Sequence, residues 1–155
     1  MKLILNLLIL LTTIAINNVH AQSSVPDTYQ LVKGGKSYPK INLYLFYNPD
    51  HGWTKDTINN KTVFKNGKDL FSLAPSKTQG IEISEDEYDE IEFTNVKNLY
   101  EIESLEINKR SEQIEKTEKR KLIPQLDHRV LKLHLIKEYN GSYYVYIVDW
   151  TSLTY

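Results

Sequence analysis

The chain has 155 residues and an almost balanced charge, with 19 Lys and Arg against 20 Asp and Glu. Nucleic-acid-binding domains usually carry a clear basic excess, so this balance argues against a nucleic-acid partner. Cysteine is absent from the sequence, which excludes disulfides, thiol nucleophiles, iron–sulfur clusters and cysteine-ligated zinc. Apolar burial and sheet hydrogen bonds must therefore stabilise the fold.

The N-terminal segment has the pattern of an export signal. Lys2 gives a positive start, Leu3 to Ile16 form an apolar run, and Val19-His20-Ala21 offers small residues for cleavage after Ala21. The alternative is a retained membrane anchor, but the run is shorter than the roughly twenty residues that cross a bilayer. We therefore expect a periplasmic or secreted protein without a stable membrane anchor. The predicted organisation is a cleaved signal over 1–21, a disordered lead over 22–28 and a single α+β domain over 29–155.

Two segments in the first half of the expected domain are typical of β-strands. Residues 40–47 are rich in aromatic and branched side chains and are bounded by Pro39 and by Asn48-Pro49-Asp50. Farther along, Asn66-Gly67 separates two short β-prone runs. Both residues tolerate the positive φ of a type I′ turn, so this pair predicts a hairpin.

The middle of the chain carries helix signals. Ser84 is followed by acidic residues up to Glu87, which is the pattern of a capping box and predicts a short helix over 85–91. Apolar residues then recur at intervals of three and favour a helix over 96–107. Residues 108–121 are almost wholly polar and indicate either a solvated helix or a mobile excursion.

The clearest structural signal is a long hairpin near the C-terminus. Two β-prone runs, His128–Tyr139 and Ser142–Thr151, are joined by Asn140-Gly141. The two-residue turn sets a register that pairs Leu135 with Tyr146, Leu133 with Val148, Leu131 with Trp150 and Lys132 with Asp149. Apolar residues lie on both faces, so both faces need covering. The predicted fold is α+β, with a bent antiparallel β-sheet, one to three helices packed on one face and a long C-terminal β-hairpin.

Aromatic residues supply the main candidates for binding. Tyrosine offers a large contact area with a polar tip and little side-chain entropy to lose, which suits recognition surfaces. The alternative is that these residues only build strands and core. The predicted binding residues are Tyr44, Tyr47, Trp53, Tyr143, Tyr144 and Tyr146.

Catalytic and metal-binding patterns are sparse. The candidates for a His–carboxylate pair are Asp50 and His51 after the early strand, and His134 and Asp149 in the final hairpin. His128 and His134 lie about 20 Å apart along one expected strand, so they do not share an ion. Neither a metal nor a cofactor is predicted. Gly34-Gly35-Lys36 lacks the first glycine of a phosphate-binding loop and is interpreted as a turn.

These features favour an exported, non-enzymatic module that binds a partner protein or a small ligand, for example as an inhibitor or immunity-type protein. One alternative is a small cofactor-free enzyme with a His–carboxylate pair in a sheet-lined pocket. Another is a structural protein of the cell envelope. A pocket that holds a His–carboxylate pair would favour the enzyme, and an exposed tyrosine patch would favour the binding module.

Cleavage after Ala21 should leave Gln22 at the N-terminus of the exported protein. N-terminal sequencing of the protein from the periplasm or the medium should begin at Gln22 or at its cyclised form, because the small residues of Val19-His20-Ala21 fit a signal peptidase. Recovery of the chain with Met1 intact in the membrane fraction would contradict this prediction.

Overall fold

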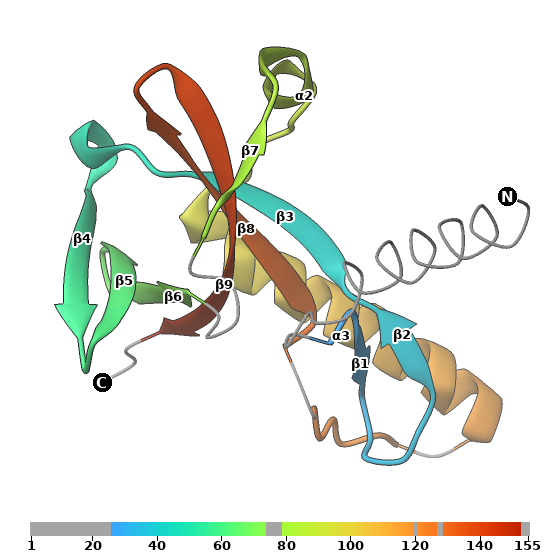
Figure 1. Cartoon of the computed structure of the whole chain (residues 1–155). Coiled ribbons are helices and arrows are strands. Elements are labelled where there is room, and N and C mark those ends of the chain that lie inside the picture. The colour runs from blue at the N-terminus through green and yellow to red at the C-terminus, as the bar shows by residue number, and fades with distance from the viewer. Residues whose placement is uncertain (1–25, 74–78, 120, 127–128, 153–155) are drawn as a thin grey trace, which may run out of the picture.

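A seven-stranded mixed sheet forms the centre of the structure (Figure 1). The computed structural model describes residues 26–73, 79–119, 121–126 and 129–152. The strand order is β3-β8-β9-β6-β5-β4, with β7 paired to β9 off this path, and β1 and β2 form a separate small sheet. The predicted α+β class with a final hairpin is confirmed. The predicted signal over 1–21 lies outside the described residues.

Five of the nine described strands lie in segments that the sequence predicts, and the other four were not predicted. The small sheet begins at Thr28, one residue before the expected start of the domain. The strands are β1 (Thr28–Gln30), β2 (Ser37–Pro39), β3 (Ile41–Phe46), β4 (Trp53–Ile58), β5 (Lys61–Asn66), β6 (Asp69–Leu73), β7 (Ile81–Ile83), β8 (Leu131–Tyr139) and β9 (Ser142–Ser152). The helices are the 3-10 turns η1 (Pro49–His51) and η2 (Val96–Asn98) and the α-helices α2 (Glu85–Asp89) and α3 (Leu99–Glu118).

Strands β3 and β8 run parallel, whereas the other strand pairs described in the large sheet are antiparallel. The parallel ladder extends from Ile41↔Leu131 to Phe46↔Ile136. A parallel pair needs a long crossover connection, and here that connection contains β4 to β7 and both α-helices. The sequence predicts an antiparallel sheet, because its tight turns indicate pairing only between strands that are consecutive in the chain. The partner of β3 lies far along the chain, and no turn motif indicates that the two strands pair.

Two hairpins turn through consecutive residues in the left-handed region, as a type I′ turn requires. Asn140-Gly141 joins β8 to β9 with φ values of 52° and 79°, which confirms the predicted turn. Asn59-Asn60 joins β4 to β5 with φ values of 50° and 62°. The sequence analysis missed this second hairpin because β4 is short of apolar residues.

The β5–β6 hairpin is present, but its turn is shifted by one residue from the prediction. Asn66 pairs with Asp69 in the ladder, so the turn residues are Gly67 and Lys68. Gly67 takes the positive φ, 59°. Asn66 stays in its strand and donates a side-chain hydrogen bond to the carbonyl oxygen of His51, at 3.3 Å. The prediction of Asn66-Gly67 as the turn is therefore wrong. The Asn-Gly motif is a local pattern and gives no indication that Asn66 bonds to the distant His51.

Both predicted helical segments begin where expected but end at other residues. Ser84 and Glu87 form both bonds of the capping box, and α2 ends at Asp89, two residues before the predicted end. Helix α3 continues to Glu118, so the expected 96–107 helix and the polar segment after it form one element with η2 as its first turn. Ile114 packs against the core from the polar half, which explains why the helix continues.

The main core lies between α3 and one face of the large sheet. The β8–β9 ladder runs from Leu133↔Val148 to Tyr139↔Ser142, as predicted. The predicted pairs of Leu131 and Lys132 lie beyond this ladder, and Trp150 pairs instead with Phe71 of β6. The core residues from the strands include Leu45, Phe64, Phe71, Leu131, Leu133, Leu135, Val148 and Trp150, which pack with Val96 and Leu99.

Helix α2 packs on the opposite face of the sheet. Its Tyr88 ring stacks on Tyr143 of β9, with ring centroids 3.7 Å apart, and meets Phe46 of β3 edge-on. Ile136 is fully buried on this side, since it alternates with the core residue Leu135 along β8. Both faces of the hairpin are therefore covered by helix, one by α3 and one by α2, rather than one face alone.

Trp150 joins several elements at one end of the core. Its indole Nε1 donates to Asp69 Oδ1 at 2.8 Å, and both residues are buried. The Tyr100 ring of α3 meets the indole edge-on at 4.7 Å, and the Arg129 guanidinium lies 4.4 Å from it. Arg129 in turn donates to the buried Glu103 at 2.7 Å. The indole thus connects β6, β9, α3 and the segment before β8.

Trp150→Ala should lower the free energy of unfolding by about 3–5 kcal/mol, because it removes a large buried side chain and leaves a cavity. Trp150→Phe should cost about 1–3 kcal/mol, because it leaves the buried Asp69 carboxylate without its indole donor. Urea unfolding followed by circular dichroism measures both. The control Ile123→Ala, at a side chain 77% exposed, should change stability by less than about 0.5 kcal/mol. A loss below about 1 kcal/mol for Trp150→Ala would contradict the core assignment.

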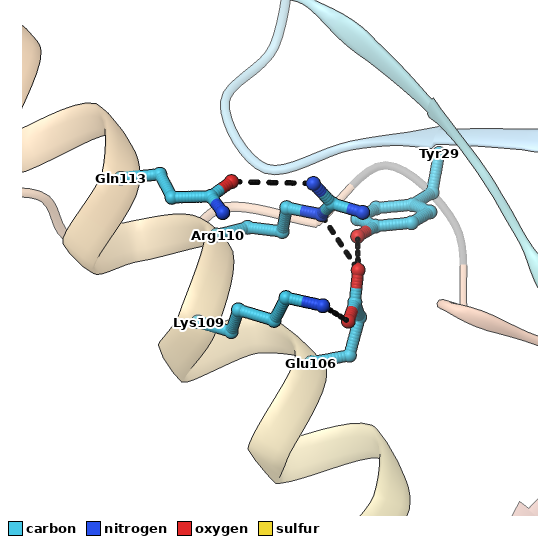
Figure 2. A network of polar contacts seen from close by, with 5 residues as sticks. All are labelled: Tyr29, Glu106, Lys109, Arg110 and Gln113. Carbon is cyan, nitrogen blue, oxygen red and sulfur yellow. Dashed lines mark hydrogen bonds and ion pairs between the residues drawn. The ribbon is translucent and has the colours of Figure 1, made fainter.

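A polar network attaches β1 to α3 (Figure 2). The hydroxyl of the fully buried Tyr29 donates to Glu106 Oε1 at 3.3 Å, and Arg110 Nε donates to the same oxygen at 2.6 Å. Arg110 Nη1 also donates to Gln113 at 3.2 Å, and Lys109 lies 3.8 Å from Glu106 Oε2. Burial first, and then the Glu106 charge, raises the pKa of Tyr29 above its ordinary value of 10.0.

The raised pKa of Tyr29 predicts a loss of stability in alkali. The folded protein keeps the phenol proton to higher pH than the unfolded chain, so this stabilisation is complete below about pH 10 and declines above it. The free energy of unfolding between about pH 8 and about pH 11 should therefore fall less steeply in Tyr29→Phe than in the parent. Tyr139→Phe, at an exposed tyrosine, is the matched control. Equal slopes for Tyr29→Phe and the parent would refute the prediction.

Candidate functional site

The predicted binding residues lie on two different faces of the sheet. Tyr144 and Tyr146 of β9 lie on the face that carries Val148 of the core, because they alternate with it along the strand. Tyr47 and Trp53 contact this same group through Phe64 and Phe71. Tyr44 and Tyr143 lie on the opposite face. The structure thus gathers four of the six predicted residues and separates the other two.

The β8–β9 hairpin carries a cleft of about 540 Å³ near its tip. Strand β3 ends opposite Ile136, so β8 and β9 continue past it. In this distal part Lys137 pairs with Tyr144, and their side chains share one face. We call this site the tyrosine cleft; it is lined by Gln79, Gly80, Lys137, Tyr139, Tyr144 and Tyr146.

Lys137 is the cation of the tyrosine cleft. Its ammonium lies 5.7 Å from the ring centroid of Tyr47 and 5.9 Å from that of Tyr139. Aromatic faces attract a cation, so these contacts hold the ammonium beside the cleft. Within the described part of the chain, no carboxylate forms an ion pair with Lys137. Its positive charge is therefore available to a ligand.

Gly80 closes one side of the tyrosine cleft by direct contact with tyrosine. A Cβ atom at this position would lie 2.6 Å from the Tyr146 ring and 3.0 Å from Tyr144 Cβ. Any side chain here would displace the Tyr146 ring, so the cleft requires glycine. The sequence analysis missed both Gly80 and Lys137, because neither has a local motif and their roles depend on strands that meet only in the fold.

Tyr146 links the tyrosine cleft to the aromatic core. Its ring centroid lies 6.5 Å from that of Phe64, which meets Tyr47 edge-on at 5.2 Å. Burial is the main cause that raises the pKa of Tyr146 above its ordinary value, followed by the nearby Tyr144. The Tyr146 hydroxyl therefore stays protonated at neutral pH and remains a hydrogen-bond donor.

The loop with Asp50 and His51 forms the 3-10 turn η1. The Asn48 side chain accepts from the Asp50 backbone N–H at 2.9 Å, and Gly52 takes a left-handed φ of 79°. His51 borders a second cleft of about 460 Å³ together with Trp53. Trp53 is mostly buried and packs against Phe71 and Tyr47. The hydrogen bond between Asn48 and Asp50 fits the interpretation of this loop as a turn.

His134 and Asp149 lie on the face opposite the main core. The His134 ring stacks on Tyr44 of β3 at 4.8 Å, and its Nε2 lies 3.1 Å from Asn42 Oδ1. Asp149 is exposed and lies two residues from Ile147, the register partner of His134. His51 and His134 thus have different neighbours and do not form one site together. His128 lies outside the described residues.

The described residues contain no group of three or more His, Asp or Glu side chains placed to hold a metal ion. The acidic residues near α2 have helix-cap and surface positions, such as Glu87. Its pKa lies below the ordinary value because Ser84 donates both backbone and side-chain hydrogen bonds to it. None of the described helices has the length and apolar character needed to span a membrane.

Comparison with protein-family models, curated proteins and solved structures finds no match for this chain. Function is therefore inferred from the side chains alone. Among the sites above, the tyrosine cleft combines three tyrosines with a lysine that lacks a carboxylate partner within the described residues.

Proposed function

We propose that this protein is an exported, non-enzymatic binding module that uses the tyrosine cleft to bind a partner protein through an acidic side chain. The observation that carries the proposal is the Lys137 ammonium, which is placed by two tyrosine rings and has no ion-pair partner among the described residues. The leader pattern at Lys2 to Ala21 supports export.

An Asp or Glu side chain is the group that best fits this cleft. The ammonium of Lys137 donates charge-assisted hydrogen bonds to a carboxylate, and these are stronger than bonds between neutral groups. Tyr144 and Tyr146 border the same cleft, and phenol groups add further donors. Burial of the carboxylate between tyrosine rings would remove water from the ion pair and strengthen it.

The tyrosines favour a protein as the partner. Tyrosine and other aromatic residues are enriched in protein interfaces, where a few of them contribute most of the binding free energy. Tyr139 is 60% exposed at the hairpin tip, so a protein surface reaches it without a change in the fold. If the partner is an enzyme, the module would act as an inhibitor or immunity-type protein.

Photo-crosslinking from the tyrosine cleft tests this proposal. p-Benzoylphenylalanine replaces Tyr139 or Tyr144 in the full chain, which is expressed and irradiated in its source cells. We expect both positions to crosslink to the same protein, which mass spectrometry identifies. The control position is Phe93, which is also aromatic, is 37% exposed and packs with Tyr88 of α2.

Binding of the purified partner then tests the chemistry of the contact. Lys137→Gln should weaken binding at least about tenfold, because it removes a charge-assisted hydrogen bond. Lys55→Gln, at an exposed lysine of β4, is the matched control and should bind as the parent does. Binding that is unchanged in Lys137→Gln, or crosslinking that is equal at Phe93 and at Tyr139, would refute the proposal.

A further inference from the structure

Another cleft is lined by residues of the β1–β2 hairpin and of the last turns of α3. These two elements lie together at the end of the molecule away from the tip of the β8–β9 hairpin (Figure 1). Its volume is about 500 Å³, which is within the range of small-ligand pockets. The loop from Leu31 to Lys36 forms one wall, and α3 forms the other from Arg110 to Glu118. Leu122 closes the cleft from the segment after the helix. We call it the hairpin–helix cleft.

The hairpin–helix cleft has an apolar floor and a cationic rim. Leu31, Tyr38 and Leu122 of the floor are buried. The charged residues that line it are the cations Lys33, Lys36 and Arg110 and the carboxylate Glu118. With Glu106, which forms an ion pair with Arg110, three positive charges stand against two negative charges, so the net charge is +1. Glu118 also has an interaction of its own.

Arg110 is held in place before any ligand binds. Its guanidinium is hydrogen-bonded to Glu106 and Gln113 (Figure 2), and it lies 5.0 Å from the ring centroid of Tyr38. A guanidinium has five N–H donors, so these two bonds leave donors for a ligand. A fixed guanidinium loses little entropy on binding an anion.

The Lys36 ammonium is a second cation close to the Tyr38 ring. Its ammonium lies 5.5 Å from the centroid of the Tyr38 ring. Among the residues that the structure describes, no carboxylate forms an ion pair with Lys33 or Lys36. Cations that gather around one ring repel each other unless an anion lies between them. The rim is therefore suited to an anionic group.

We propose that the hairpin–helix cleft binds a small carboxylate that carries an apolar chain or ring. The rim of Lys33, Lys36 and Arg110 would hold the carboxylate, and the floor around Tyr38, Ile114 and Leu122 would hold the apolar part. Burial of an aliphatic chain against such a floor contributes about 0.8 kcal/mol for each methylene group. Both parts of the ligand are needed, because exposed lysines alone bind anions weakly in water.

Titration of the protein with octanoate, followed by ¹H–¹⁵N NMR, tests this site. We expect the largest shifts at the amides of residues 31–36, 113–117 and 122. The double variant Lys33→Gln with Lys36→Gln should bind octanoate at least about tenfold more weakly. The matched control is the double variant Lys55→Gln with Lys61→Gln, at two exposed lysines of β4 and β5, which should bind as the parent does. The spectra show whether each variant is folded.

Two further probes separate the parts of the ligand. Inorganic phosphate supplies charge without a chain, and 1-octanol supplies a chain without charge, so both should bind more weakly than octanoate. Octanoate that binds the lysine double variant as tightly as the parent would overturn the proposal. Equal affinity for phosphate or for octanol would also overturn it, since either result would show that only one part of the ligand is recognised.

Discussion

The pairing of β9 on both of its edges is the constraint on which the rest of the structure depends. Its eleven residues pair with β8 along one edge and with β7 and then β6 along the other. Alternation along the same strand places Trp150 in the main core and Tyr143 under α2. A shift of one residue would exchange these two faces. The Asn140-Gly141 turn excludes that shift, because it fixes the register at the start of the strand.

Local signals predicted the parts of this fold that are built from neighbouring residues. Asn140-Gly141 turns as expected, and Ser84 caps its helix as expected, because each motif supplies its own backbone geometry. The parallel pairing of β3 with β8 was not predicted, since no turn connects them. The candidate site was predicted in the same partial way. Tyr144 and Tyr146 could be predicted because tyrosine is typical of binding surfaces. The role of Gly80 in the cleft depends on its contact with the Tyr146 ring, which no local pattern indicates.

Contacts between cations and aromatic rings recur at the main junctions of this cysteine-free chain. Arg129 lies against Trp150 at one end of the core, and Lys137 lies between Tyr47 and Tyr139 at the hairpin tip. The two differ in one respect. Arg129 also forms an ion pair with Glu103, so its charge is compensated and its role is structural. Lys137 has no such partner among the described residues and borders a cleft instead of the buried core.

The parallel ladder between β3 and β8 also limits when the large sheet can be completed. Its strands join residues as far apart as Asn42 and His134, which are 92 positions apart. Contacts over such distances form slowly, because the intervening chain must first lose much of its conformational freedom. A nascent chain therefore has no partner for β3 until β8 has been synthesised. Completion of the large sheet is therefore a late step, which follows synthesis of almost the whole chain.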